Sequence, residues 1–220
     1  MMKKSDMYAV AAAILVGVGI VGVVARKSGK GEGATNVDTS NGNASSMAEL
    51  QFPPPTSHNH TYELLGLHST EVEEGFDEFS GTTTTKVHIR EFGRVFFELQ
   101  VSAEQQGRDP VEPPTTVHLV FVYRPGFDFM RFESPPTANL LLDGQRLSLG
   151  TLALRDDGDQ YMSTTIGIRD FLRIVGASEV EGRFDDKAKE EGGMSRKPFQ
   201  VDAEELNVLR DFASRLAPRN

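Results

Sequence analysis

The chain has 220 residues, of which 38% are hydrophobic and 25% are charged. This length and composition suit one ordinary domain with a long tail, and the charged fraction excludes a protein with many membrane spans. Because the chain has no cysteine, disulfide bonds, thiolate catalysis, cysteine-ligated zinc and iron–sulfur clusters are excluded. The formal net charge of −9 argues against nucleic acid or anionic lipid as a partner of the whole surface.

Residues 1–27 have the features of a transmembrane signal anchor. Positions 7–25 are 19 consecutive uncharged residues, and a helix of that length extends about 28 Å, close to the thickness of a bilayer's hydrocarbon core. The one small-residue cleavage motif, Val23–Ala25, is followed at once by basic residues, so we expect the segment to stay uncleaved; a cleaved signal peptide is the alternative. Two lysines before the stretch favour a cytoplasmic N-terminus, and the basic residues after it weaken that argument.

The same stretch contains a glycine pattern typical of dinucleotide-binding proteins. Gly17, Gly19 and Gly22 have the spacing of that fingerprint, and Asp38 follows at a suitable distance. The fingerprint also needs a helix directly after the glycines to hold the pyrophosphate, and the Gly-rich residues 28–33 leave no room for one. We therefore expect no cofactor.

Residues 28–61 are predicted to be a disordered tether. They are rich in Gly, Ser, Asn, Thr and Pro and contain few large apolar side chains, so they bury too little surface to offset the entropy of ordering. As a flexible coil the tether reaches on the order of 30 Å. It would hold the following domain, residues 62–220, near the membrane.

The first half of that domain is predicted to be built from strands. Residues 71–78 are strongly acidic and are interpreted as a solvated loop, in preference to a calcium site, because no calcium-ligand spacing is present. Alternating apolar residues then predict a hairpin that turns at Glu91–Arg94. Residues 117–123 predict another strand, in which Val120 and Val122 indicate burial on both faces.

A second hairpin is centred on Asp143-Gly144, a strong hairpin signal between two apolar runs. Its apolar phase changes at Gly150, which predicts a bulge or bend there. A turn at residues 156–159 then leads into a strand over residues 161–166.

Two helices and two short strands are predicted for the end of the chain. The first helix covers residues 168–175 and stops at Gly176. Short strands follow at residues 180–184 and 198–201, the latter at a sheet edge because its proline cannot donate a hydrogen bond. In the last helix Asp202 and Glu205 form a capping box, and a buried stripe is expected from four residues at helical spacing: Leu206, Leu209, Ala213 and Leu216.

These elements predict a mainly β fold. About seven or eight short strands followed by two helices are typical of an antiparallel β-sandwich or a barrel-like sheet with a helical cover. With the N-terminal transmembrane helix, the expected organisation is an anchor, a tether and one globular domain.

Residues 140–216 resemble the C-terminal part of uncharacterised bacterial extracytoplasmic domains. The shared features are the Asp143-Gly144 hairpin, the short helix, the strand at Val180–Arg183 and the capped terminal helix, and the loop over residues 187–197 is longer than this pattern leads one to expect. The resemblance implies a location in the bacterial envelope, in the periplasm or at the cell surface, and implies no activity.

Sequence motifs for catalysis or metal binding are missing. The chain has no nucleophile elbow, no helical pair of zinc-binding histidines and no phosphate-binding loop. His58 and His60 lie in the polar tether, where nothing would hold further metal ligands, and His88 and His118 are interpreted as strand residues with hydrogen-bond partners. We therefore expect neither a metal nor catalytic residues.

One segment, residues 123–132, combines aromatic and basic side chains around a Pro-Gly turn. Exposed aromatic and arginine side chains commonly anchor a protein partner or an apolar ligand. The alternative is that the aromatic residues alternate into the core as another strand begins. The candidate binding residues are Tyr123, Arg124, Phe127, Phe129 and Arg131.

Together these features predict a membrane-tethered, extracytoplasmic binding or structural module that is not an enzyme. An envelope protein is the expected partner, and nucleic acid is not. The alternative function is an envelope hydrolase that acts on carbohydrate or peptide through carboxylates on separate loops.

Overall fold

The computed structural model of the chain describes residues 50–56, 61–64, 68–93, 97–123, 131–186 and 196–219. The predicted anchor and most of the predicted tether lie outside these residues. Among the described residues there is no helix whose length and apolar character would let it cross a bilayer.

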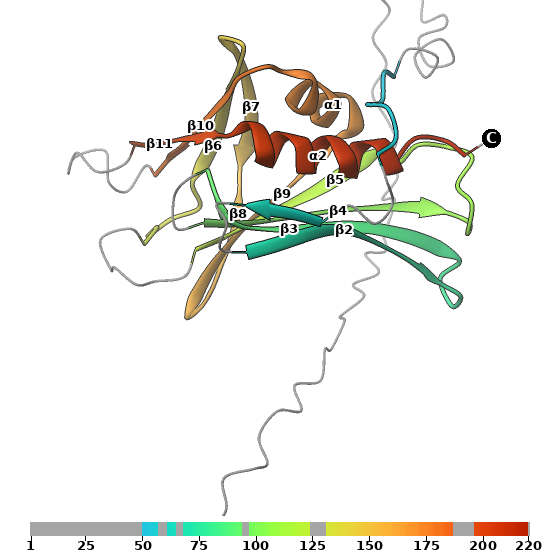
Figure 1. Cartoon of the computed structure of the whole chain (residues 1–220). Helices are drawn as coiled ribbons and strands as arrows, with labels where there is room; N and C mark the ends of the chain where they lie inside the picture. Colours follow the sequence, from blue (N-terminus) through green and yellow to red (C-terminus); the bar gives the residue numbers. More distant parts are fainter. Residues whose placement is uncertain are drawn as a thin grey trace, which may run out of the picture. The chain divides into compact units, whose positions relative to one another are not determined.

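The described strands form two antiparallel sheets (Figure 1). The large sheet consists, in spatial order, of β1 (Thr61–Leu64), β2 (His68–Asp77), β3 (Thr82–Phe92), β4 (Phe97–Gln106), β5 (Thr116–Tyr123), β9 (Asp159–Gly167) and β8 (Ala153–Asp157). The small sheet consists of β11 (Arg196–Val201), β10 (Val180–Asp185), β6 (Thr137–Leu142) and β7 (Gln145–Thr151). The prediction of a mainly β, antiparallel fold with two late helices is confirmed, with more strands than the seven or eight expected.

The β6–β7 hairpin and the bend that follows it carry the chain from the small sheet into the large one. Asp143 and Gly144 both have positive φ, at 49° and 81°, as a two-residue hairpin turn requires. Gly150 also has a positive φ, at 78°, beside a shift in the β6–β7 register. The fully buried Leu152 then separates β7 from β8. The bend predicted from the change of apolar phase is therefore present, and it is the corner at which the chain changes sheets.

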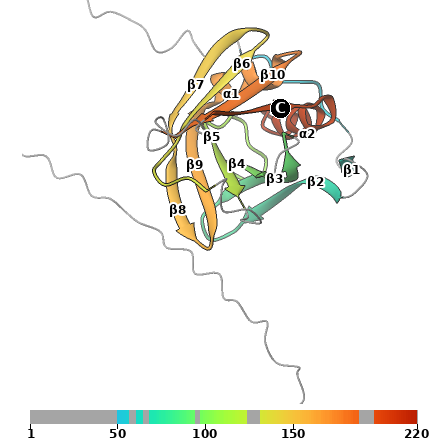
Figure 2. The same ribbon diagram turned by 90° about the vertical axis from the view of Figure 1, so that its left-hand side faces the viewer.

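Two helices complete the cover of the core. Helix α1 (Ile168–Gly176) packs near β5 and β9, and α2 (Ala203–Arg215) packs along β1, β2 and β3. In Figure 2 the strands follow one another along a curve from β2 to β10, and α2 lies at the open side of that curve. The helices also contact each other, because the rings of Phe171 and Phe212 meet edge to face with centroids 5.5 Å apart.

The predicted capping box of α2 is present and also holds a turn of the large sheet. The Asp202 side chain accepts a hydrogen bond from the backbone of Glu205, and the Glu205 carboxylate accepts from the backbone of Asp202. The same buried carboxylate accepts from the backbone N–H of Gly93, at 2.7 Å. The four residues of the predicted stripe, Leu206, Leu209, Ala213 and Leu216, are all buried.

An aromatic cluster joins the two sheets. Phe199 of β11 stacks on Phe184 of β10, with ring centroids 5.2 Å apart, and lies 5.7 Å from Phe92 of β3. Phe184 in turn meets Phe97 and Phe121 of the large sheet, each at 5.1 Å. The ring of Phe199 lies so close to Gly182 that any side chain there would overlap it.

The folded part of the chain includes residues 50–56, which the sequence analysis assigned to the tether. Leu50 and Phe52 pack against the core, and the hydroxyl of Thr56 donates to Asp211. Asp211 forms a buried ion pair with Arg215 at 3.2 Å, and Arg215 also donates to the backbone carbonyl of Val72, at 2.7 Å. Apolar packing by Leu50 and Phe52 and the hydrogen bond of Thr56 to α2 thus join this segment to the folded domain.

One local prediction was wrong. The acidic residues 71–77 belong to strand β2, because Val72 faces the core and the carboxylates between the buried positions can remain in water. The predicted end of the first helix is confirmed: Gly176 is the last residue of α1, and Ala177 leaves the helix with an extended backbone.

Because Phe199 packs on Gly182, replacing this glycine with alanine should reduce the stability of the fold far more than the same change at Gly75. We expect Gly182→Ala to destabilise the fold by about 2–3 kcal/mol, because the new methyl group forces the aromatic cluster apart. Gly75→Ala is the matched control: that glycine is also in a strand, its backbone is not left-handed, and a methyl group there meets nothing within 4 Å. The measurement is the urea midpoint of the full chain, and equal midpoints for the two variants would contradict this packing.

Candidate binding site

The predicted binding segment divides between the core and residues outside the structural description. Tyr123, at the end of β5, is fully buried, and its ring centroid lies 5.6 Å from that of Phe97. Arg124, Phe127 and Phe129 fall within residues 124–130, which lie outside the described residues. Tyr123 therefore has the core position that was the alternative interpretation, and a binding role for the other three stays a prediction.

Arg131, the last residue of the predicted set, is held by the β8–β9 hairpin. Its Nε donates to Asp156 at 3.0 Å, and a second guanidinium nitrogen donates to the other carboxylate oxygen. The hydrogen bond from Arg131, followed by that from Gln160, lowers the pKa of Asp156 below its usual range. The buried amide of Gln160 also bonds both the N–H and the C=O of Phe132, at 2.8 Å each. These contacts fix the described end of the segment to the large sheet.

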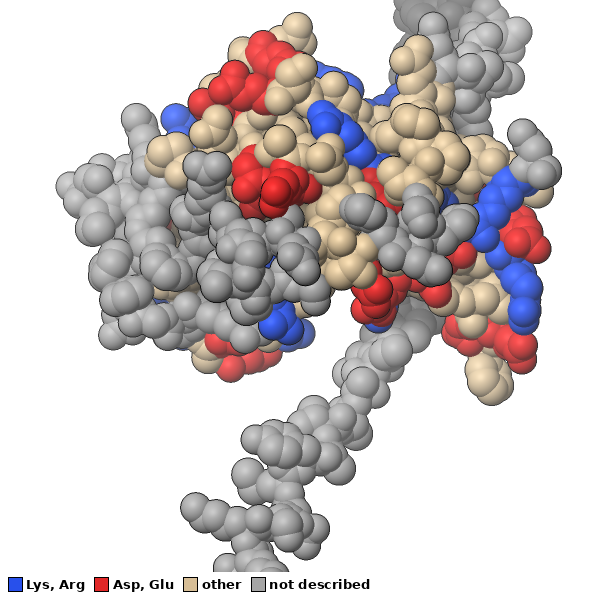
Figure 3. Space-filling view, viewed as in Figure 1, with Lys and Arg blue, Asp and Glu red and all other residues tan. Residues whose placement is uncertain are grey.

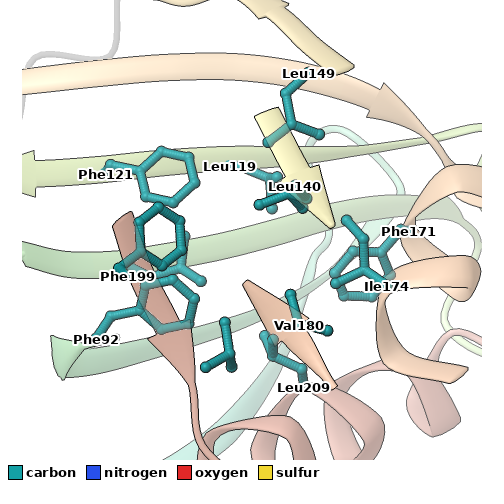
Figure 4. Close-up of a pocket in the computed structure, with 12 residues that line it drawn as sticks. Phe92, Leu119, Phe121, Leu140, Leu149, Phe171, Ile174, Val180, Phe199 and Leu209 are labelled. Atoms are coloured by element: carbon teal, nitrogen blue, oxygen red, sulfur yellow. The ribbon is translucent and has the colours of Figure 1, made fainter. Parts of the chain in front are cut away.

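An apolar cavity between the two sheets is too small to be a ligand site. Its volume is about 30 Å³, whereas pockets for small molecules usually have about 300–1,000 Å³. In Figure 4 the rings of Phe92, Phe121 and Phe199 line one side of it, and the ring of Phe171 lies with aliphatic side chains on the other. Since no polar atom lines it, it would not bind water either, and it is best described as a packing gap in the core.

The outer face of the large sheet carries polar side chains over a shallow hollow of about 470 Å³. His88 Nε2 lies 2.7 Å from a carboxylate oxygen of the largely buried Glu98, and His118 Nδ1 lies 3.2 Å from the hydroxyl of Thr165. Such a carboxylate can orient an imidazole for acid–base chemistry. The strand register places Gln100 opposite His88, with Glu98 on one side of Gln100 and Ser102 on the other, and the imidazole bonds to Glu98. No group of three potential metal ligands occurs in the described part of the chain.

The most exposed large apolar side chains of the described residues gather at one end of the large sheet. Phe79 is 103% exposed and Val111 is 74% exposed. We call this region the loop end: it consists of the β2–β3 turn, residues 78–81, and the β4–β5 connection, residues 107–115. The β4–β5 connection lies beside the C-terminus (Figure 1), and the backbone N–H of Gly107 donates to the carbonyl of Gly81 at 2.8 Å, which joins the two connections.

The turn that carries Phe79 is internally braced. The Asp77 carboxylate accepts hydrogen bonds from the backbone of Phe79 and from the Ser80 hydroxyl, both at 2.9 Å. The backbone carbonyl of Asp77 accepts from Gly81, whose positive φ of 67° suits glycine. The hydrogen bond from the Phe79 N–H, followed by that from Ser80, lowers the pKa of Asp77. The phenyl ring is thus presented to solvent on a defined backbone.

The loop end is acidic, with its basic side chains already paired. It carries four carboxylates, those of Asp77, Glu78, Asp109 and Glu112, counting Asp77 at its base. Arg108 pairs with Glu78 at 3.1 Å, and Arg219 pairs with Glu74 and lies 3.9 Å from Asp109. In Figure 3 red and blue side chains are interleaved at this end of the molecule. The loop end itself has one guanidinium group, that of Arg108, against four carboxylates, and Arg219 brings its own partner Glu74, so negative charge is in excess.

Sequence reasoning did not single out Phe79. It interpreted the acidic residues just before it as a solvated loop and searched for binding residues where aromatic side chains cluster. The sequence signal that was available is an apolar residue inside an Asp-x-x-Ser-Gly turn, where a side chain has no core to enter.

In comparisons with protein-family models, curated proteins and solved structures, no match is found for this chain. The resemblance of residues 140–216 therefore rests on its motifs alone.

The bracing of the Phe79 turn is expected to depend on pH. Because the folded pKa of Asp77 lies below its ordinary value of 3.8, its hydrogen bonds persist at neutral pH and are lost as the pH falls through the lowered pKa. In an NMR titration of the full chain, the Phe79 amide shift should follow the Asp77 carboxyl. Asp77→Asn should abolish this pH dependence, and Ser80→Ala should raise the pKa of Asp77 part of the way. A Phe79 amide that titrates identically in Asp77→Asn would contradict the bracing.

Proposed function

We propose that this protein is a noncatalytic binding module that is tethered to the membrane through residues 7–25 and displays its β-rich domain outside the cytoplasm. In this proposal the domain binds an envelope protein through the loop end. The apolar length of residues 7–25 supports the anchor, and the polar composition of residues 28–49 supports a tether between anchor and domain.

The observation that carries the binding role is the complete exposure of Phe79 on a braced turn. A phenyl ring in water costs free energy that burial in a partner recovers, on the order of 2 kcal/mol for a fully buried ring. Little additional conformational entropy is lost when a ring on an already ordered turn is bound. Phe79 is therefore suited to be the central anchor of an interface, and Val111 lies on the connection joined to the Phe79 turn at the same end of the sheet.

The charges of the loop end define the partner. Two carboxylates of the region, those of Glu78 and Asp109, have side chains that are 78% and 80% exposed. Such exposed charges contribute mainly to partner choice and to the rate of association. The expected partner presents an apolar pocket for Phe79 with lysine or arginine side chains around its rim.

Three of the four edge strands in the described sheets favour recognition by loops over recognition by strand addition; the fourth edge strand is β7. The edge strand β11 contains Pro198, which cannot donate a backbone hydrogen bond, and the edge strand β8 is short and charged. The edge strand β1 has only four residues. A partner that adds a strand would thus find a poor template at each of these three edges.

Photo-crosslinking in intact cells tests the binding site. The full chain carries p-benzoylphenylalanine in place of Phe79 or Val111, and we expect one discrete cross-linked protein, shared by both positions. The matched control places the same probe at Gln145, an exposed residue of the β6–β7 hairpin, and should not yield that product. Phe79→Ala combined with the probe at Val111 should reduce the product at least about fivefold, since the anchor is lost. A product that is unchanged by Phe79→Ala, or that appears equally at Gln145, would contradict the proposed site.

Protease accessibility tests the tether and its orientation. In cells whose outer layers are opened but whose cytoplasmic membrane is intact, we expect added protease to cut the tether and release the domain. Protection of the whole chain until the membrane is dissolved would contradict the extracytoplasmic location. Recovery of the untreated protein in the soluble fraction would contradict the anchor.

A further inference from the structure

The outer face of the small sheet, on the side away from the core, contains a hollow of about 340 Å³. Its floor is the backbone of β6 and β10, and its walls come from β7, β6, β10 and β11. Leu141, which is 42% exposed, and the exposed Pro198 give it apolar surface. Its polar side chains include Arg146, Asn139 and Arg183.

A chain of hydrogen bonds crosses this face and fixes Arg146. Nε and Nη2 of Arg146 both donate to the amide oxygen of Asn139, at 3.2 and 2.8 Å. The amide nitrogen of Asn139 donates to Asp185 at 3.2 Å, and Asp185 also pairs with Arg183 at 2.9 Å. Asn139 is only 7% exposed, so the group that positions Arg146 is itself held rigidly.

Within the described part of the chain, the charge of Arg146 has no counterion. Its partner Asn139 is neutral, and none of the ion pairs between described residues includes Arg146. Arg183 differs, because its charge is opposed by Asp185. The nearest acidic residue in the Arg146 row of the sheet is Glu181, and Leu141 lies between the two in the register. Arg146 therefore presents a guanidinium group that is oriented by a buried amide and has no ion-pair partner among the described residues, in a hollow that it shares with Leu141, Pro198 and Glu181.

We propose that this hollow is a binding site for a monocarboxylate with an apolar body, and that Arg146 binds the carboxylate. A guanidinium edge matches a planar carboxylate geometrically and electrostatically, and Leu141 with Pro198 would cover the apolar body. A dianionic phosphate fits less well, because Glu181 and Asp185 also border this face and would repel the additional charge. The site lies on β6, β7, β10 and β11 and goes beyond the proposed function, which uses the loop end.

Titration of the full chain in detergent micelles with three small probes tests this proposal. The readout is the Nε–Hε NMR signal of Arg146, which reports on this guanidinium alone. N-acetyl-leucine should shift it saturably, whereas N-acetyl-leucinamide, which lacks only the negative charge, should bind at least about tenfold more weakly. Inorganic phosphate should not displace N-acetyl-leucine. The tripeptide acetyl-Gly-Gly-Leu shows which kind of molecule carries the carboxylate. If it binds more tightly than N-acetyl-leucine, the site is assigned to a peptide C-terminus; if the two bind equally, the site is assigned to a small free acid.

Variants control for the fold and for nonspecific charge. By calorimetry, Arg146→Gln should weaken N-acetyl-leucine binding at least about tenfold. Arg146→Lys keeps the positive charge but loses the two parallel N–H donors of the guanidinium group, so it should have an intermediate effect. Arg173→Gln, on the exposed face of α1, is the matched control and should bind normally. Equal binding of the amide, displacement by phosphate, absence of saturable binding, or unchanged affinity in an Arg146→Gln protein with a normal melting temperature would each overturn the proposal.

Discussion

The ring of Phe199 packs between the two sheets, where two glycines have no side chain and leave space for it. It lies on the backbone of Gly182 in the neighbouring strand and against Gly93 at the end of β3. Stacking on Phe184 and contact with Phe92 place it between the small sheet and the large one. Because Gly93 also donates to Glu205 of α2, the sheets and the terminal helix meet at one point. The position of every surface discussed above depends on this packing, since both sheets would otherwise be free to shift.

The elements that could be predicted from the sequence are those whose cause is local. Asp143-Gly144 determines its own turn, and Asp202 with Glu205 determines the start of α2, so both were predicted correctly. The elements that were missed depend on distant partners. Strand β2 looks like a solvated acidic loop until Val72 is placed against the core, and residues 50–56 look like a tether until Thr56 meets Asp211 on α2.

The same distinction explains how much of the candidate site could be predicted. Residues 123–132 were predicted as a binding segment because aromatic residues cluster there. Whether each side chain is buried depends on the tertiary structure, and Tyr123 belongs to the core. Phe79 is a single aromatic residue among acidic neighbours, and only the way β2 and β3 meet shows that nothing covers it. Arg146 is likewise unremarkable in the sequence. Its significance arises from a neutral partner, Asn139, on the adjacent strand.

We propose that the β-rich domain recognises, through Phe79, a protein partner with basic side chains around an apolar pocket. The most direct test of this proposal is the kinetics of the purified full chain with the protein that cross-links at the loop end, compared between the wild type and Phe79→Ala. Burial of the ring in the partner predicts a dissociation rate at least about tenfold faster for the variant, with little change in the association rate. The association rate of both proteins should fall as salt is raised, because opposite charges steer the encounter. Equal dissociation rates for the two proteins would contradict the account.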